Sequence, residues 1–207
     1  MTRLGGRGPH DYGAWSILAD GLDESSVIYS IGIGDDISFD LDVIATLGAV
    51  VHAFDPTPES LAWLERQEVP DQLVVHPFAV GNRDGVASFY PHHNKDWISH
   101  SMVPHAHTSS EVVEVPVRRL RTLMETLGHD RIDLLKIDIE GSEYEMIEDM
   151  AASGVDVRQV LVEFHHRMGG FEPAMTRRAV EQLESLGLRC FYTSPNGTEY
   201  SFVKVEG

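Results

Sequence analysis

The sequence predicts an α/β fold in which a mostly parallel sheet lies between two layers of helices and closes with an antiparallel hairpin strand. Three observations predict it. Short apolar segments alternate with longer amphipathic ones, as in repeated strand–helix units. The first clear strand, 27–33, runs into a glycine turn that opens a helix, which is how a Rossmann-like nucleotide-binding unit begins. Near the end, segments 188–193 and 199–205 flank Pro195–Gly197, whose Asn-Gly step is a strong hairpin signal.

A chain of 207 residues is most simply one domain with a single core. We expect this domain at 27–207, preceded by an N-terminal extension at 1–26. The extension holds DYGAWSILADGL at Asp11–Leu22, which predicts a short helix that covers a sheet edge or forms a lid over a cofactor. Strand–helix alternation breaks down at about 82–117, where two β segments flank a polar loop, so we expect a β and loop insertion there.

The other elements are assigned from hydrophobic period and from turn residues. Short apolar or β-branched runs indicate strands, and apolar residues three and four positions apart indicate helices. Proline and acidic residues support the first turns of several helices. The expected strands are 50–54, 73–75, 86–90, 112–117, 132–139 and 157–164, and the expected helices are 37–47, 57–68, 119–127, one that starts at Ser142, and 173–186.

The balance of charge limits the partners. A formal net charge of −17 opposes binding to nucleic-acid phosphates and to anionic membranes, so we expect neither partner. No apolar run approaches the ~20 residues that span a bilayer, and the first residues lack the apolar stretch of a signal peptide. The single cysteine, Cys190, fits a reducing compartment. The sequence therefore predicts a cytoplasmic protein.

The most informative stretch is IDLLKIDIEGSEYEMIED at Ile132–Asp149, which joins a strand to a helix. Because side chains alternate across a strand, Lys136, Asp138 and Glu140 share one side of it. A parallel strand that is covered on both faces is normally apolar throughout. These charges run to its carboxyl end, where open α/β sheets bind ligands. A purely structural ion-pair network is the alternative, but the position favours a functional site.

A nucleotide-like cofactor is expected at the glycine turn. Gly32 and Gly34 let the backbone approach a ligand closely, and Asp55 follows 21 residues after Gly34. That offset is near the ~20 residues at which an acidic side chain binds a ribose diol. Asp55 also has the position of a cap for the helix after Pro56, and both roles are compatible.

Further contacts with the cofactor are expected beside this turn and after the third strand. Asp35 directly follows the second glycine, and Phe78 and Ala79 follow the strand at 73–75. Phe78 would lie near an adenine ring or, equally well, pack in the core. Ala79 would line the same part of the site.

A second polar group comes from the strand at 157–164. Glu163 and His165 lie on one side near its carboxyl end, so they meet Asp138 and Glu140 if this strand neighbours 132–139. Carboxylates with a histidine could form a general-base site or bind a divalent cation through Asp138, Glu140 and His165.

The polar loop at 91–110 is rich in histidine. No pair in it has the helical i, i+4 spacing of metalloenzyme ligands, so three interpretations stay open: a metal site, substrate contact or a lid, and a solvated loop. Its histidines are His92, His93, His100, His105 and His107.

Several motifs together resemble the FkbM family of class I methyltransferases. The Lys-Ile-Asp-Ile-Glu-Gly core is the most specific of them, and the likeness covers roughly 27–205. The matching segments are LLKIDIEGSEYEMIED at 134–149, AFDPTPES at 53–60, VPVRRLRTLM at 115–124 and VLVEFHHR at 160–167.

The resemblance implies a Rossmann-like three-layer sandwich with a seven-stranded sheet, whose last strand is antiparallel and inserted. It also implies S-adenosylmethionine as cofactor and O-methylation of a hydroxyl on a small molecule or sugar. By position, Gly32 and Gly34 would line the methionine end, Asp55 would hold the ribose hydroxyls, and Asp138 would lie at the transfer centre.

Two positions depart from the family pattern. The acidic residue expected two before the first glycine is Ser30, and the third glycine is Asp36. We therefore expect either that the amino-acid end of the cofactor is held differently, through Asp35 or Asp138, or that cofactor binding is weakened or lost.

The mechanism that follows is an in-line methyl transfer. His165 or Glu163 would act as the base, Asp138 and Lys136 would position the acceptor, and a divalent metal is a variant. An NAD(P)-dependent oxidoreductase is one alternative function, and a non-catalytic binding protein of the same fold is another. The sequence does not predict the oligomeric state.

Overall fold

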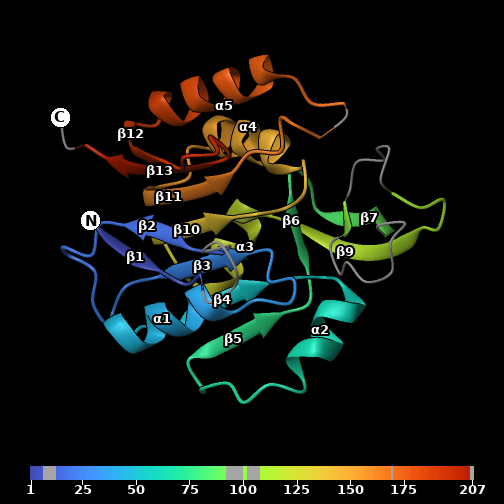
Figure 1. The fold of residues 1–207 in the computed structure, drawn as a ribbon, viewed down its shortest axis with the longest axis horizontal. Helices are drawn as coiled ribbons and strands as arrows, with labels where there is room; N and C mark the ends of the chain where they lie inside the picture. Colours follow the sequence, from blue (N-terminus) through green and yellow to red (C-terminus); the bar gives the residue numbers. More distant parts are fainter. Residues whose placement is uncertain (7–12, 92–99, 102–107, 169, 206–207) are drawn as a thin grey trace.

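The computed structural model describes residues 1–6, 13–91, 100–101, 108–168 and 170–205, with only the backbone at 100–101. Within these ranges the chain forms a three-layer α/β sandwich, with a central sheet between two layers that bury its faces (Figure 1). None of the helices in these ranges is both long and apolar enough to cross a membrane.

The central sheet of the described chain has seven strands in the order β12-β13-β11-β10-β3-β4-β5. Neighbouring strands from β11 to β5 are parallel, whereas β13 is inserted antiparallel between β11 and β12. This confirms the predicted mostly parallel seven-stranded sheet with its C-terminal hairpin. The strands are β3 (Ile28–Ile31), β4 (Val51–Phe54), β5 (Leu73–His76), β10 (Ile132–Ile137), β11 (Val157–Glu163), β12 (Leu188–Thr193) and β13 (Glu199–Lys204).

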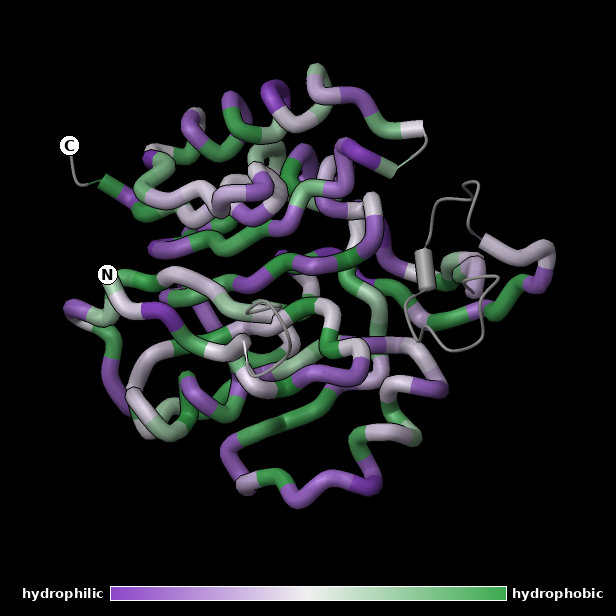
Figure 2. The backbone as a smooth tube through the Cα atoms, viewed as in Figure 1, coloured by the Kyte–Doolittle hydropathy of each residue, from purple (hydrophilic) through white to green (hydrophobic). Residues whose placement is uncertain are grey.

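Helices cover the two faces of the sheet because each presents one apolar stripe to it. Hydrophobic and hydrophilic residues alternate along the outermost of these helices, α5 (Figure 2). Three helices bury one face, namely α3 (Leu120–Leu127), α4 (Glu143–Ser153) and α5 (Pro173–Ser185), while α1 (Ser38–Leu47) and the end of α2 (Pro58–Leu64) pack on the other.

The predicted insertion is a second, smaller sheet beside the carboxyl ends of the central strands (Figure 1). Its strand order is β6-β9-β7-β8, and Phe89 and Val115 belong to its own small core. The β segments expected at 86–90 and 112–117 are confirmed, and the sheet begins earlier than expected. Its strands are β6 (Ala79–Gly81), β7 (Gly85–Pro91), β8 (His100–Ser101) and β9 (Val113–Arg119).

The described part of the N-terminal extension forms a hairpin. The helix predicted over Asp11–Leu22 is therefore wrong over 13–22, the part of that segment that the structure describes. Strand β2 (Trp15–Ile17) pairs antiparallel with β1 (Thr2–Leu4). Gly13 and Gly21 bracket this stretch with φ of 78° and 77°, a conformation that an α-helix does not contain. All three residues of β2 are buried, and Trp15 and Ile17 belong to the core that α1 shares, so the hairpin covers a sheet face instead of an edge.

Candidate active site

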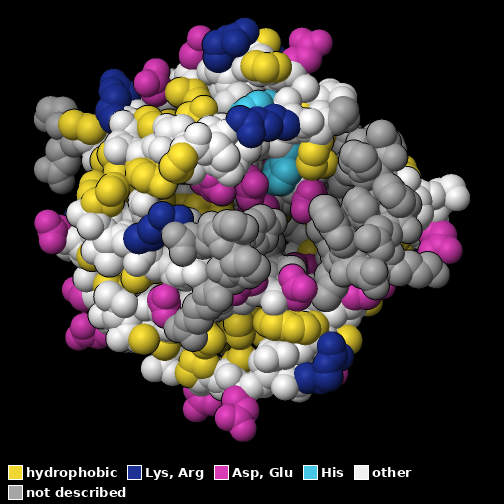
Figure 3. Space-filling model, in the orientation of Figure 1, with side chains coloured by type: hydrophobic (Ala, Val, Ile, Leu, Met, Phe, Trp, Pro, Cys, Tyr) yellow, Lys and Arg dark blue, Asp and Glu magenta, His cyan; other side chains and the backbone are white. Residues whose placement is uncertain are grey.

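A pocket opens at the carboxyl ends of β3, β4 and β10, next to the point where the strand order reverses between β3 and β10. About 1000 Å³ of space not filled by atoms lies inside it, open solvent at its mouth included. Acidic and histidine side chains gather near the middle of the face seen in Figure 3. The predicted site residues that line the pocket are Gly32, Gly34, Asp35, Asp55, Pro56, Ala79, Lys136, Asp138 and Glu140.

The glycine turn after β3 makes the closest backbone approach in the pocket. Gly32 has φ of 83°, and a Cβ built on it would lie 1.8 Å from the carbonyl oxygen of Asp138. The Asp138 amide donates to the Ile31 carbonyl at 3.0 Å, so the turn and the end of β10 are locked together. Gly34 has φ of 59° with open space around its Cβ position. The turn therefore places backbone, with no side chain, at the pocket wall.

Asp55 organises that turn from the end of β4. Its Oδ2 accepts hydrogen bonds from the amides of Ile33 and Gly34, at 2.9 and 3.0 Å, and its Oδ1 accepts one from Thr57 at 2.8 Å. The carboxylate thus lines the pocket and holds the backbone at Thr57, the residue directly before α2, while its binding of a ribose stays a prediction. Oδ2 thus has both of its lone pairs occupied, whereas Oδ1 accepts one hydrogen bond and keeps a lone pair that can accept a ribose hydroxyl.

Lys136 acts on the turn and on Asp138 from a buried position. Its Nζ donates to the Gly32 carbonyl at 2.5 Å and lies 4.0 Å from Asp138 Oδ2. The ammonium also lies 5.6 Å from the centre of the Trp15 ring, a cation–π contact from the N-terminal hairpin. These contacts hold Lys136 against the glycine turn and next to Asp138, where it also lines the pocket.

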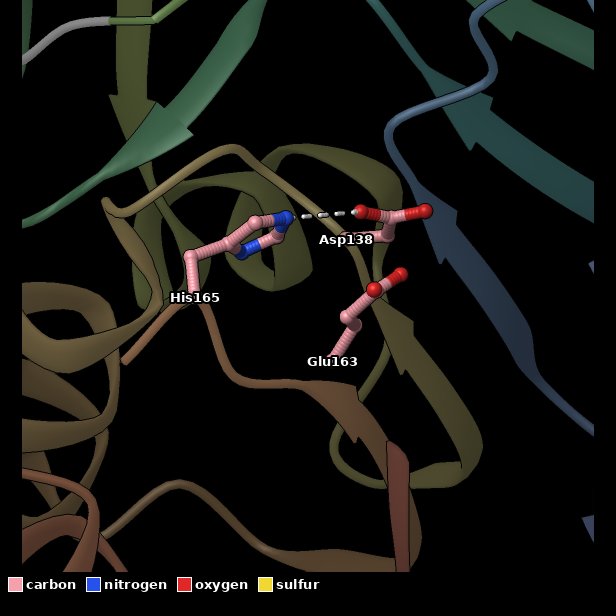
Figure 4. A group of neighbouring side chains, drawn as sticks. All are labelled: Asp138, Glu163 and His165. Atoms are coloured by element: carbon pink, nitrogen blue, oxygen red, sulfur yellow. Dashed lines mark ion pairs between the residues drawn. The ribbon is translucent and has the colours of Figure 1, made fainter. Parts of the chain in front are cut away.

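Acidic side chains meet His165 beside Asp138, at the ends of β10 and β11 (Figure 4). The Nε2 atom of His165 lies 3.9 Å from Asp138 Oδ1 and 3.6 Å from Glu140 Oε2. Glu163 completes the group: ligand atoms of Asp138, Glu163 and His165 all lie within 4.8 Å of one another. The predicted meeting of the two strand ends is therefore confirmed.

Glu143, which sequence reasoning treated only as a favourable charge at a helix start, fixes this histidine. The side chain is completely buried at the start of α4. Its Oε1 accepts from the His165 backbone amide at 2.9 Å and from the ring Nδ1 at 3.3 Å, and its Oε2 accepts from the Gly141 amide at 2.8 Å. The ring is held so that Nε2 faces Asp138 and Glu140.

The carboxylates shift the pKa of both neighbouring groups. Burial alone would lower the pKa of His165, but the hydrogen bond to Glu143 and the surrounding negative charges raise it to about 10. Burial, followed by the charge of Asp138, raises the pKa of Glu163 to about 8. An imidazolium carries a proton on both ring nitrogens and has no lone pair to accept another, so His165 must first lose one of these protons if it is to act as the predicted base.

Asp40 is a second buried acid that sequence reasoning missed. It lies in the first turn of α1, at i−3 and i−4 from the buried Val43 and Ile44, and that spacing was the available signal. Burial raises the pKa of its carboxyl, and the charge of Lys136 opposes the shift, followed by Ser30. An acidic group thus lies near the position where the family pattern expects one, supplied by the helix because β3 carries Ser30.

The other departure, Asp36, also has a local role, since its Oδ1 accepts from the Ser38 amide at 2.7 Å at the start of α1. Of the two interpretations of Phe78, the structure supports packing in the core, since Phe78 is not among the residues that line the pocket. Phe78 stacks on His76 at 6.2 Å between ring centroids and packs against the core behind the pocket. Its neighbour Ala79 lines the pocket because successive side chains of an extended chain point in opposite directions.

Apolar groups that sequence reasoning did not assign complete the wall. Trp15, Phe54, Val80 and Phe89 line the pocket together with the predicted polar residues. Glu163 and His165 lie outside this lining and reach the pocket through Asp138. The histidines of the loop at 91–110 lie outside the described residues, apart from the backbone of His100 in β8.

The comparisons with known proteins agree with this geometry. The family model described as "Methyltransferase FkbM domain" matches residues 27–190. The human and rat proteins named "Probable methyltransferase-like protein 24" are each 27% identical to this chain over 177 residues, which cover 80% of the chain and 42% of theirs. The chain thus spans less than half the length of these curated relatives.

A solved structure shows the same fold at low sequence identity. The Methanococcus jannaschii fibrillarin pre-rRNA processing protein aligns with a TM-score of 0.50 and 9% identity, over 91% of this chain and 70% of that one. This likeness concerns the fold alone. The family model, in contrast, spans most of the sequence and includes both the glycine turn and the acidic strand end. The chain belongs to the FkbM family of methyltransferase domains.

Proposed function

We propose that this domain transfers a methyl group from S-adenosylmethionine to a hydroxyl oxygen of a small molecule or sugar. One observation carries the proposal: the pocket at the switch point of the sheet runs from Asp55 and the glycine turn to Asp138. Family membership implies the methyl donor and favours methyl transfer over the oxidoreductase alternative. The acceptor is inferred from the chemistry of the acidic end.

The donor half of the pocket fits an adenosine-bearing cofactor. Asp55 would accept hydrogen bonds from the ribose hydroxyls, and the glycine turn leaves room for the methionine portion. The wall formed by Phe54, Val80 and Phe89 offers apolar surface to the adenine. Bound S-adenosylmethionine supplies an electrophilic methyl group on a sulfonium.

The acidic end can orient and deprotonate an acceptor. The two oxygens of Asp138 face different groups: Oδ1 lies toward His165 and Oδ2 toward Lys136. Asp138 also lines the pocket, so we assign it the hydrogen bond from the acceptor hydroxyl. As the oxygen–methyl bond forms and the carbon–sulfur bond breaks, the hydroxyl proton passes to a carboxylate of this rim. The net charge of −17 favours an acceptor other than nucleic acid.

Donor binding is tested first, because it separates the catalytic domain from a non-catalytic protein of the same fold. S-adenosylmethionine and its demethylated product should each raise the melting temperature, whereas NAD should not, since a ligand stabilises the state that it binds. Asp55→Ala should weaken binding, and Asp71→Ala is the exposed control. A melting shift with NAD alone would favour the oxidoreductase, and the absence of any shift would favour the binding protein.

The role of Asp138 is tested with radiolabelled methyl donor and a panel of hydroxylated compounds, sugars included. Asp138→Asn keeps the size of the side chain but removes its charge, so turnover should fall by about 10²-fold or more while donor binding persists. Label found on an amine instead of an oxygen would contradict O-methylation. Near-normal turnover in the variant would remove Asp138 from the mechanism.

A further inference from the structure

We propose that Asp138, Glu163 and His165 bind one divalent first-row cation of the Mn²⁺ type at the acceptor end of the pocket. The binding site follows from the geometry of these three side chains. Its role, which is to hold the acceptor oxygen next to the methyl donor, rests on the proposed function.

The three side chains converge from a rigid frame. Asp138 and Glu163 follow directly after Ile137 and Val162, which are register partners in the parallel strands β10 and β11. One ligand atom from each of Asp138, Glu163 and His165 lies within 4.8 Å of the others (Figure 4). Small side-chain rotations can bring three such atoms to the 2.0–2.2 Å that first-row cations need, roughly the Zn²⁺ and Mg²⁺ distances.

The histidine is oriented as metal-bound histidines are. Such a ring usually gives its second N–H to a carboxylate, which fixes the tautomer and aims the other nitrogen at the ion. Here Nδ1 is held by Oε1 of the completely buried Glu143 at 3.3 Å, and the same oxygen accepts from the His165 amide. The Nε2 atom is therefore the free end of the ring that faces the carboxylates.

The negative charge around the three proposed ligands favours a bound cation. Glu140 Oε2 lies 3.6 Å from the same Nε2, and Glu199 is the register partner of Glu163 on the antiparallel strand β13. The Oε2 atom of Glu199 is buried without a hydrogen-bond partner. Carboxylates packed this closely repel one another unless positive charge lies between them, and a divalent ion that displaces the Nε2 proton supplies more of it than the single charge of the His165 imidazolium.

The donor set indicates the class of ion. Two carboxylates favour hard ions such as Mg²⁺ and Mn²⁺, whereas an imidazole favours first-row transition metals, so Mn²⁺ satisfies both preferences. Three protein ligands leave open positions in an octahedral shell for water and for an acceptor oxygen. Because Asp138 also lines the pocket, those positions face the substrate.

The site is tested with Mn²⁺ alone on EDTA-treated, dialysed protein. Calorimetry should show one ion per chain, and the electron paramagnetic resonance signal of free Mn²⁺ should fall by one equivalent. Glu163→Gln removes one ligand charge with little change in shape and should weaken binding by at least about 10-fold. Glu148→Gln is the matched control, because Glu148 lies in an exposed ion pair with Arg178 on the outer side of α4.

Two outcomes would overturn the proposal. The first is the absence of stoichiometric binding, and the second is equal binding by the wild type and Glu163→Gln, which would show that Mn²⁺ is held loosely by the acidic surface. Thermal melts of both variants establish that they are folded. The proposed function is tested separately from the ion site. If the protein binds no Mn²⁺ and still transfers methyl groups in EDTA, the ion site is refuted and the proposed function stands. If the protein binds Mn²⁺ but not S-adenosylmethionine, the proposed function is refuted and the ion site stands.

Discussion

At the scale of single residues, two glycines of the same turn differ in how much space they leave for a side chain. Gly32→Ala would drive its Cβ into the Asp138 carbonyl, which is backbone and cannot move aside, whereas Gly34→Ala meets open space. We expect Gly32→Ala to lower the unfolding free energy by roughly 2–5 kcal/mol, from backbone strain plus overpacking, and Gly34→Ala by only ~1–2 kcal/mol from the strain. Urea unfolding measures both. Equal losses would show that the turn is not locked against β10.

Single residues also differ in whether the sequence alone identifies them as part of the site. Asp55 and Asp138 stand out because each charge follows an apolar strand, at the edge where ligands bind. Glu143 and Asp40 do not stand out, since an acid in the first turn of a helix is common and stabilises exposed helices too. Their burial comes from tertiary packing. Likewise, the protonation of His165 depends on how closely carboxylates from separate elements approach it.

At the scale of elements, the N-terminal hairpin explains one error of prediction. Its strands are three residues long and pair across a gap of ten residues, so neither the alternation nor the turn signal of a usual hairpin is present. The apolar residues of Trp15–Ile17 fit a helical stripe equally well. The longer strands and helices were predicted correctly because their hydrophobic period extends over more residues.

Trp15 gives this hairpin a part in the site. It is buried, packs edge-on against Phe39 at 6.4 Å between ring centroids, lies under the Lys136 ammonium and lines the pocket. Trp15→Ala should cost about 3–5 kcal/mol of stability and also weaken donor binding, because Lys136 loses its support. Trp15→Phe should retain most of both. Denaturant melts and donor titrations check this, and a loss of stability with unchanged donor affinity would limit Trp15 to the core.

At the scale of the whole molecule, a histidine cluster makes stability depend on pH. His52 of β4 is half-buried, its Nδ1 lies 3.0 Å from His76 Nε2, and its ring meets Tyr29 and His129 edge-on. Burial, then the charges of His76 and His129, lowers the pKa of His52 to about 4. The folded protein thus binds a proton less readily than the unfolded chain does. The contribution of His52 to stability is therefore complete above about pH 6.5 and declines as pH falls toward 4.

The share of His52 in that decline should be ~1–2 kcal/mol, less than the full linkage value because the ring is partly exposed to solvent. His52→Phe keeps the ring stacking and removes the titrating group. Urea unfolding of both proteins between pH 7 and 4.5 isolates this share from that of the carboxylates. Parallel pH profiles for the wild type and the variant would show that His52 does not contribute.

The sheet as a whole was the most predictable part of the molecule. Every parallel strand except β5 is an apolar run followed by a helix, and right-handed crossovers leave few ways to arrange such units. The place of β13 between β11 and β12 came from family resemblance, since a hairpin signal fixes which strands pair but not which one is inserted. The second sheet depends on pairing between distant segments, and β6 is too short to show a period.

The separateness of that second sheet has an evolutionary consequence. One continuous stretch of chain, 79–119, encodes β6 to β9 and one wall of the pocket, while the turn, Asp55 and Asp138 belong to the central sheet. Recombination or loop insertion inside this stretch can remodel the wall without breaking any strand pair of the central sheet. Relatives could therefore diverge in the substrate that they modify while they keep the same donor-binding residues. Chimaeras in which residues 79–119 are exchanged between two relatives would make such a change in one step.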